Sequence, residues 1–108
     1  MTKFAVYQNR NLRSAVSFPL LVDVQSELLQ DLETRVVIPL ARTASFTDFP
    51  LGYVMPTVEL EGKKYVLITP QITGLSRMAL GPTRGNLEAH ARAICVATDM
   101  LFRGFAVA

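Results

Sequence analysis

The spacing of apolar and polar positions changes once along the chain, close to residue 86. Before that point, apolar residues alternate with polar ones over short runs, which is the period of β-strands. From Asn86 to Gly104, charged residues recur every three or four positions, which is the period of an α-helix. The pattern therefore predicts a mainly β chain that ends in one helix.

Six runs have strand character: 4–7, 20–24, 35–40, 57–60, 63–69 and 72–80. Glu61 and Gly62 join two of these runs and predict a β-hairpin turn. Pro39 has no N–H to give to a neighbouring strand, so it predicts a sheet edge or bulge at that point. Short strands at this spacing, followed by a single helix, favour a small antiparallel barrel or sheet with the helix packed beside it.

The helix has predicted boundaries and two different halves. Gly81, Pro82 and Gly85 are expected to break the preceding strand, Asn86 to cap the first turn and Gly104 to end the helix. One stripe is charged: Glu88, Arg92, Asp99 and Arg103, with Cys95 between them. The opposite face is apolar and holds Leu87, Ala91, Ile94, Leu101 and Phe105. Since the second half is apolar nearly all round, we expect it to be covered by the sheet on one side and by a second copy of the chain on the other.

Two polar stretches, Gln8–Ser17 and Ala41–Pro56, are predicted to be surface loops. The second has the composition of a mobile segment that orders against a partner. The whole chain, 1–108, is expected to be a single domain because 108 residues, half of them hydrophobic, form one core. No signal-peptide pattern and no apolar run of about 20 residues are found, so a cytoplasmic protein without a membrane segment is expected.

The net charge of +2 and the isoelectric point of about 9.0 raise the question of nucleic-acid binding. The basic residues are scattered among acids, which disfavours direct binding to DNA or RNA. A mildly basic surface is equally suited to an acidic protein segment.

Few residues suggest bond-making chemistry. Cys95 is the single cysteine and is predicted to be a small buried hydrophobe, and His90 is the single histidine and is predicted to lie on the surface. One histidine is too few for a histidine metal cluster, and no phosphate-binding glycine loop is present, so no cofactor is predicted. Asp23 lies within a strand and is expected to pair with a basic residue or a backbone amide. The residues alone predict a β-rich interaction module.

Three stretches carry a more specific signal. They are FAVY at 4–7, LVDVQSELL at 21–29 leading to TRVVIPL at 34–40, and DMLFRGF at 99–105. Together they resemble the CcdB family of bacterial toxins, and the similarity spans nearly the whole chain. This resemblance implies a homodimer with an SH3-like β-barrel, a small antiparallel sheet and a C-terminal helix, the fold shared by the CcdB and MazF toxins.

The resemblance also implies a function without catalysis. Such toxins bind the A subunit of DNA gyrase and trap its cleaved-DNA complex. A cognate antitoxin with a disordered acidic tail removes them from gyrase, and the two proteins together repress their own operon. DNA would therefore be contacted only through the antitoxin complex.

The implied gyrase-binding site lies at the helix end, where the family pattern Trp-Gly-Ile corresponds to Arg103, Gly104 and Phe105. Further implied gyrase-binding positions are Asp99, Ser26, Leu28 and Leu29, which are expected to lie near the helix end. The antitoxin is expected to bind the loops 8–14 and 41–50, through Arg10, Arg13, Arg42 and Ser45.

Two alternatives remain. A ribonuclease of the MazF or Kid type would share the barrel, but its glycine-aspartate opening and its later arginine-proline pair are absent from this sequence. A non-toxic relative that only binds an antitoxin is the other alternative, because Arg103 and Phe105 replace the tryptophan and isoleucine of the family pattern.

Overall fold

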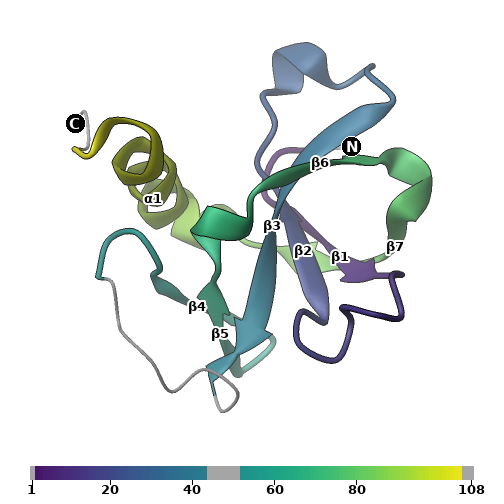
Figure 1. The fold of residues 1–108 in the computed structure, drawn as a ribbon, viewed down its shortest axis with the longest axis horizontal. Helices are drawn as coiled ribbons and strands as arrows, with labels where there is room; N and C mark the ends of the chain where they lie inside the picture. The colour runs from purple at the N-terminus through teal and green to yellow at the C-terminus, as the bar shows by residue number, and fades with distance from the viewer. Residues whose placement is uncertain (1, 44–51, 106–108) are drawn as a thin grey trace.

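The computed structural model describes residues 2–43 and 52–105. An antiparallel sheet curls into a half-barrel, and one C-terminal helix lies beside it (Figure 1). The mainly β fold with a terminal helix is confirmed. No helix in the described part of the chain has both the length and the apolar character needed to cross a membrane.

Seven strands form the sheet within these residues: β1 (Ala5–Asn9), β2 (Leu20–Asp23), β3 (Thr34–Arg42), β4 (Thr57–Leu60), β5 (Lys63–Leu67), β6 (Thr73–Ser76) and β7 (Leu80–Asn86). The helix is α1 (Ala91–Arg103). Short 3-10 turns connect them: η1 (Glu27–Leu29), η3 (Thr69–Gln71), η4 (Arg77–Ala79) and η5 (Glu88–His90).

Strand β3 is the centre of the sheet. The strand order is β4-β5-β3-β2-β1-β7, and β6 also pairs with β3. One side of β3 faces β2, whereas its other side pairs with β6 over residues 34–37 and with β5 over residues 40–42. Pro39 lies between these two partners and pairs with Leu21 of β2. The predicted edge position of Pro39 is therefore wrong: the missing N–H falls where an interior strand changes partner.

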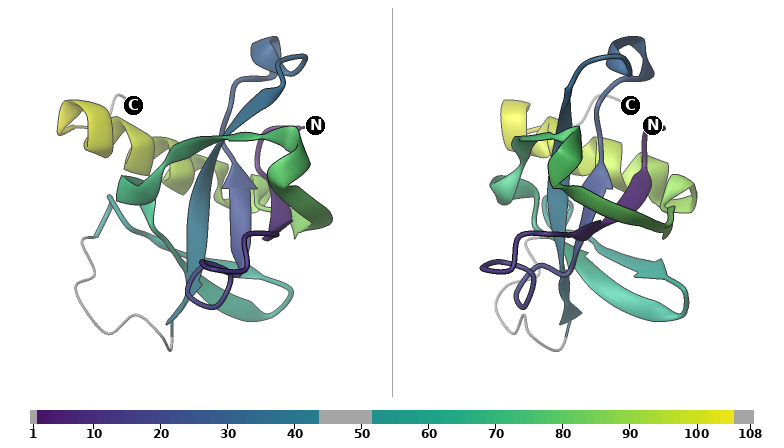
Figure 2. Two further views of the ribbon diagram at one scale, coloured as in Figure 1. Left: turned by 45° about the vertical axis from the view of Figure 1, so that its right-hand side comes forward. Right: turned by 90° about the vertical axis from the view of Figure 1, so that its right-hand side faces the viewer.

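The sheet curls strongly (Figure 2), and a side chain of the β4–β5 hairpin reaches the last strand, although the two do not pair. Glu61 and Gly62 have φ angles of 52° and 77°, which fit the predicted tight hairpin between β4 and β5. Leu60 at the end of this hairpin lies against Gly85 of β7, where an added Cβ would be only 2.9 Å from Leu60 Cδ1. A glycine at 85, with φ of 138°, thus allows the last strand to approach the hairpin closely.

The segment predicted as one strand over 72–80 is divided. Ser76 Oγ accepts a hydrogen bond from Met78 N–H at 3.2 Å, which starts the turn η4 between β6 and β7. The predicted break at Gly81, Pro82 and Gly85 is wrong because all three lie within β7. Irregularities in the pairing of β1 with β7 accommodate them.

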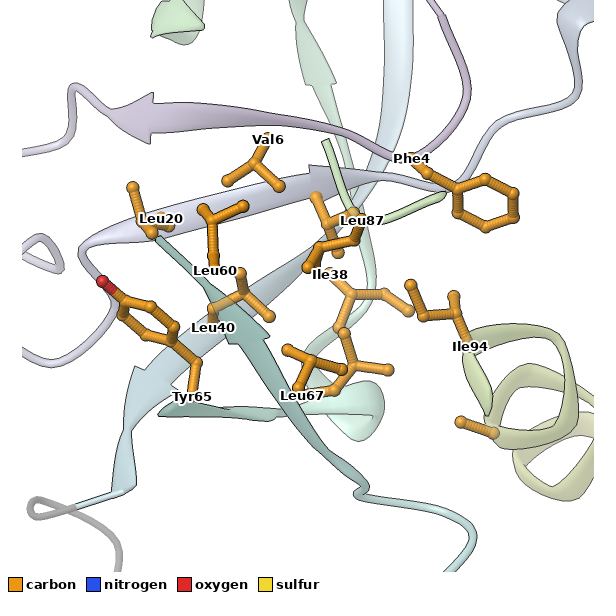
Figure 3. Packing of buried hydrophobic residues seen from close by; sticks show 13 residues of the cluster. Phe4, Val6, Leu20, Ile38, Leu40, Leu60, Tyr65, Leu67, Leu87 and Ile94 are labelled. Atoms are coloured by element: carbon orange, nitrogen blue, oxygen red, sulfur yellow. The ribbon is translucent and has the colours of Figure 1, made fainter. Parts of the chain in front are cut away.

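The main core lies between the concave face of the sheet and α1. Figure 3 shows its larger members: Phe4, Val6, Leu20, Ile38, Leu40, Leu60, Tyr65, Leu67, Leu87 and Ile94. The helix itself buries Ile94 and Ala97 in this cluster. Burial of such side chains contributes about 1.5–3 kcal/mol each, so the helix is anchored by its first half.

The helix starts later than predicted, at Ala91 in place of Asn86. Asn86 nevertheless caps the turn before it, since its Oδ1 accepts from Glu88 N–H at 2.6 Å. His90 is half-buried, and its Nε2 accepts from Glu59 N–H at 3.2 Å. Cys95 is exposed, so its predicted burial is wrong; it lies on the charged stripe, which faces away from the sheet.

Candidate functional site

The C-terminal end of α1 projects beyond the sheet (Figures 1 and 2). Gly104 ends the helix as predicted, with φ of 76° and ψ of 4°. Its N–H donates to Met100 C=O at 3.0 Å, and, among the described residues other than its chain neighbours, none has an atom within 4 Å of the position a Cβ would take. The backbone at Gly104 is therefore open to close approach by another molecule.

Arg103 is held in place on this tip. Its Nη2 donates to Asp99 Oδ1 at 2.9 Å, one helical turn earlier. The same guanidinium lies 5.8 Å from the centre of the Phe105 ring, within cation–π range. The two neighbours give Arg103 a defined position even though its side chain is 48% exposed.

Two large aromatic side chains are exposed beside Arg103. Phe102 is 70% exposed and Phe105 is 58% exposed. Phe105 continues the apolar spacing of the sequence, but the left-handed conformation of Gly104 turns the chain out of the helix before it. An exposed arginine next to exposed aromatic rings is suited to binding another protein, because aromatic and arginine side chains dominate such interfaces.

The other predicted gyrase-binding residues, Ser26, Leu28 and Leu29, lie in the turn between β2 and β3. Ser26 Oγ accepts from Leu28 N–H at 3.2 Å and caps η1. Leu28 is 93% exposed and Leu29 is 49% exposed. Figures 1 and 2 show this turn and the tip of α1 as two separate projections from the sheet.

A buried polar network positions this turn. Asp23 and Arg35 are both fully buried, and their carboxylate and guanidinium lie 2.7 Å apart, as expected for Asp23 from its place in a strand. Gln25 Nε2 donates to Leu29 C=O at 2.9 Å, and Gln25 Oε1 accepts from Val36 N–H at 2.9 Å. The end of β2, the start of β3 and the turn are thereby joined through a buried ion pair and two partly buried hydrogen bonds.

Tyr7 reports on the electrostatics of this network. Burial raises the pKa of the Tyr7 hydroxyl, and the negative charge of Asp23 raises it further. The positive charges of Arg35 and Arg77 oppose this rise in pKa. Tyr7 is therefore neutral throughout the physiological pH range.

The predicted antitoxin-binding arginines are exposed but not all together. Arg10 and Arg13 lie in the loop after β1, which Asn9 organises by donating to Ser14 Oγ at 3.0 Å and Phe18 C=O at 2.8 Å. Arg42 ends β3, and Ser45 lies outside the described residues.

The side chains available for metal binding and for partner recognition can be compared directly. Within residues 2–43 and 52–105, no group of three or more His, Cys, Asp and Glu side chains is arranged to hold a metal ion. The tip of α1 offers one cation, aromatic rings and open backbone. These features suit recognition of a partner.

Two residues, Arg35 and Phe102, were not identified from the sequence. Sequence reasoning left the partner of Asp23 unnamed, because Arg35 is twelve positions away and is brought near by the pairing of β2 with β3. It also did not single out Phe102, which is 70% exposed in this chain. A helical-wheel comparison with Ile94 and Ala97 was the signal available for Phe102.

Comparison with known protein families gives one clear match. The family model described as CcdB protein matches residues 3–104, so the match includes Arg103 and Gly104 and ends just before Phe105. No curated protein matches the chain.

Proposed function

The chain belongs to the CcdB family and is thus a CcdB-type toxin, and from this premise we propose that it binds the A subunit of DNA gyrase and traps its cleaved-DNA complex. It would act in the cytoplasm, as an inhibitor without catalytic activity of its own. The observation that carries this proposal is the projecting end of α1, where Gly104 leaves the backbone uncovered between Arg103 and Phe105.

Arg103 would take the place of the tryptophan in the family pattern. In the family, that tryptophan stacks on an arginine of gyrase, so a second arginine brings like charge to the contact. Asp99 offsets this charge through its 2.9 Å ion pair with Arg103. The planar guanidinium, ordered by Asp99 and Phe105, would then offer a flat face to the gyrase arginine.

The remaining predicted gyrase contacts would come from the turn after β2. Ser26, Leu28 and Leu29 lie in this turn, which forms a projection separate from the helix tip. In a homodimer, the turn of one protomer and the tip of the other could form a single surface. Exposed apolar side chains among the described residues support dimerisation: Leu28, Leu32, Met78 and Phe102 are 93%, 51%, 82% and 70% exposed.

Membership of the CcdB family also suggests that an antitoxin controls this protein. The acidic disordered tail of a CcdA-like antitoxin would fold on the loops that carry Arg10, Arg13, Arg42 and Ser45. Exposed cations favour this association and accelerate it at low salt. The antitoxin complex, and not the toxin alone, would bind the operator DNA and repress the operon.

The decisive test combines the purified protein with gyrase and supercoiled plasmid. Linear DNA should accumulate after denaturation of the protein, and only when gyrase is present. Expression in a gyrase-sensitive bacterium should kill cells, and co-expression of the upstream reading frame should restore growth.

Two further assays, RNA cleavage and antitoxin binding, separate the alternative functions. Cleavage of labelled RNA without gyrase would indicate a ribonuclease of the MazF or Kid type. Formation of an antitoxin complex with no linear DNA and no RNA cleavage would indicate the non-toxic relative. Either result would refute gyrase poisoning.

A further inference from the structure

A polar cavity of about 210 Å³ opens at the mouth of the half-barrel. Its lining residues come from β1 and the loop after it, β2, the end of β3, β5 and β7. In Figures 1 and 2 the β4–β5 hairpin and the loop after β1 lie away from the tip of α1. The floor of the cavity is formed by the buried side chains of Leu20 and Tyr65, which belong to the main core. Three cationic side chains, Arg42, Lys63 and Arg84, line the cavity, and we call them the basic mouth.

Strand pairing brings these three cations together from distant parts of the chain. Arg42 of β3 is directly opposite Tyr65 of β5. Lys63 is two positions before Tyr65 and so faces the same side of β5. Lys63 also pairs with Leu60, which contacts Gly85, and this contact brings Arg84 of β7 alongside the hairpin.

The basic mouth lacks a compensating charge. No Asp or Glu is found among the described residues that line the cavity. The two ion pairs formed by described residues, Asp23–Arg35 and Asp99–Arg103, lie elsewhere. Three like charges around a concave surface repel one another and concentrate anions from solution.

We propose that the basic mouth binds a phosphate group. Two guanidinium groups and one ammonium group match the oxygens of a phosphate, since arginine donates to such oxygens in pairs and lysine adds a mobile charge. A phosphate monoester carries about −1.5 to −2 charges and so balances three cations better than one carboxylate does. Gln8, also in the lining, adds an amide donor.

The size of the cavity limits what enters it. About 210 Å³ is below the roughly 300 Å³ at which pockets for whole small molecules begin. The cavity therefore accepts free phosphate, or the phosphate end of a larger molecule such as a nucleotide or a DNA strand.

The test is a titration of the isotope-labelled protein with inorganic phosphate at constant ionic strength, followed by amide NMR. Amides around Arg42, Lys63 and Arg84 should shift and saturate with phosphate but not with chloride. Lys63→Gln and Arg84→Gln should each weaken binding about tenfold, whereas Arg84→Lys should retain most of it.

Matched controls are available on the same elements. Lys64→Gln removes the same charge from the other face of β5, opposite Glu59, and should leave phosphate affinity within about twofold. The amide spectra show whether each variant is folded. Equal effects of phosphate and chloride, or equal losses in Lys64→Gln and Lys63→Gln, would overturn the site.

Competition identifies the source of the phosphate. Displacement by adenosine 5′-monophosphate alone indicates a soluble monoester, and displacement by a short DNA duplex indicates backbone phosphates; both outcomes support a phosphate site. Tighter binding of a glutamate-rich peptide would overturn it in favour of carboxylates. Neither gyrase nor antitoxin enters the measurement, so its result is independent of the proposed toxin function, although Arg42 is also a proposed antitoxin contact.

Discussion

Two ion pairs made of the same residue types have opposite surroundings in this protein. Asp23 and Arg35 lie 2.7 Å apart and are fully buried, whereas Asp99 and Arg103 lie 2.9 Å apart with side chains 26% and 48% exposed. The distances are nearly equal, so distance does not distinguish the pairs. Burial does, because water screens the exposed charges and cannot reach the buried ones.

Because one ion pair is buried and the other is exposed, the two pairs have different roles. The buried pair belongs to the network that connects β2, β3 and the Ser26–Leu29 turn. The exposed pair orients Arg103 on the projecting end of α1. The buried Asp23–Arg35 pair thus holds β2, β3 and the turn together. The exposed Asp99–Arg103 pair presents Arg103 for recognition.

Removing the buried carboxylate should have the largest effect on stability. Asp23→Asn keeps the shape of the side chain but leaves Arg35 buried without a counter-charge, so we expect a loss of about 3–5 kcal/mol in the free energy of unfolding. Urea denaturation followed by circular dichroism measures it. The matched control, Asp99→Asn, should lose no more than about 1 kcal/mol. Equal losses in the two variants would remove the distinction between the pairs.

Changing Gly104 should separate recognition from folding. Gly104→Glu places a charged side chain on the open surface, and we expect gyrase poisoning to fall about 30-fold or more, the ~2 kcal/mol typical of an interface hot spot. The left-handed φ of 76° costs a non-glycine residue roughly 1–2 kcal/mol of stability.

Gly104→Ala is the control for Gly104→Glu because it carries the same backbone cost without the bulk or charge. It should be destabilised to a similar degree and still produce linear plasmid DNA. A Gly104→Glu protein that kills cells as efficiently as the wild type would show that this surface is not the gyrase contact.

Arg103→Trp tests how the exposed pair serves recognition. Restoring the tryptophan of the family pattern should strengthen gyrase binding by about tenfold, since an aromatic ring stacks on the gyrase arginine without like-charge repulsion. Affinity is measured by surface plasmon resonance with the gyrase A subunit, and Arg103→Ala provides the baseline. Equal affinities of the wild type and Arg103→Trp would indicate that the contact has moved to other residues.

Substitution of Tyr7 should have the smallest effect on stability, and it probes the electrostatics of the buried Asp23–Arg35 pair. The raised pKa of Tyr7 means that the folded state holds the hydroxyl proton more tightly than the unfolded state does. This stabilisation is fully present below the ordinary tyrosine pKa of about 10 and is lost as pH rises through the raised folded value. Tyr7→Phe should therefore lose less stability than the wild type as the pH rises above about 9 in urea denaturation series. Parallel pH curves for the two proteins would exclude this linkage.

Local patterns predicted part of the fold well. The Glu61–Gly62 hairpin is present because adjacent strands need only a two-residue turn with positive φ. Gly104 ends the helix for a similarly local reason. At the site, the motif around Arg103 was found from the sequence, but its ordering by Asp99 and Phe105 required coordinates.

Predictions that depended on distant neighbours were less successful. Pro39 was assigned to a sheet edge or a bulge because one strand does not reveal that β3 changes partner beside it. Gly81 and Gly85 were read as breaks because their role in the close packing of β7 depends on β1 and the β4–β5 hairpin. Cys95 was assigned to the core from its apolar neighbours, although its orientation on α1 exposes it.

The sequence by itself determined the mainly β composition, the hairpin, the helix end and the motifs typical of the CcdB family, since each depends on residues close together in the chain. Only the tertiary structure decided which acid is buried against which arginine, which end of α1 stays uncovered and which three cations share the basic mouth. The physical reason is that burial and charge compensation are properties of contacts between strands, and strand pairing joins residues that the linear spacing leaves far apart.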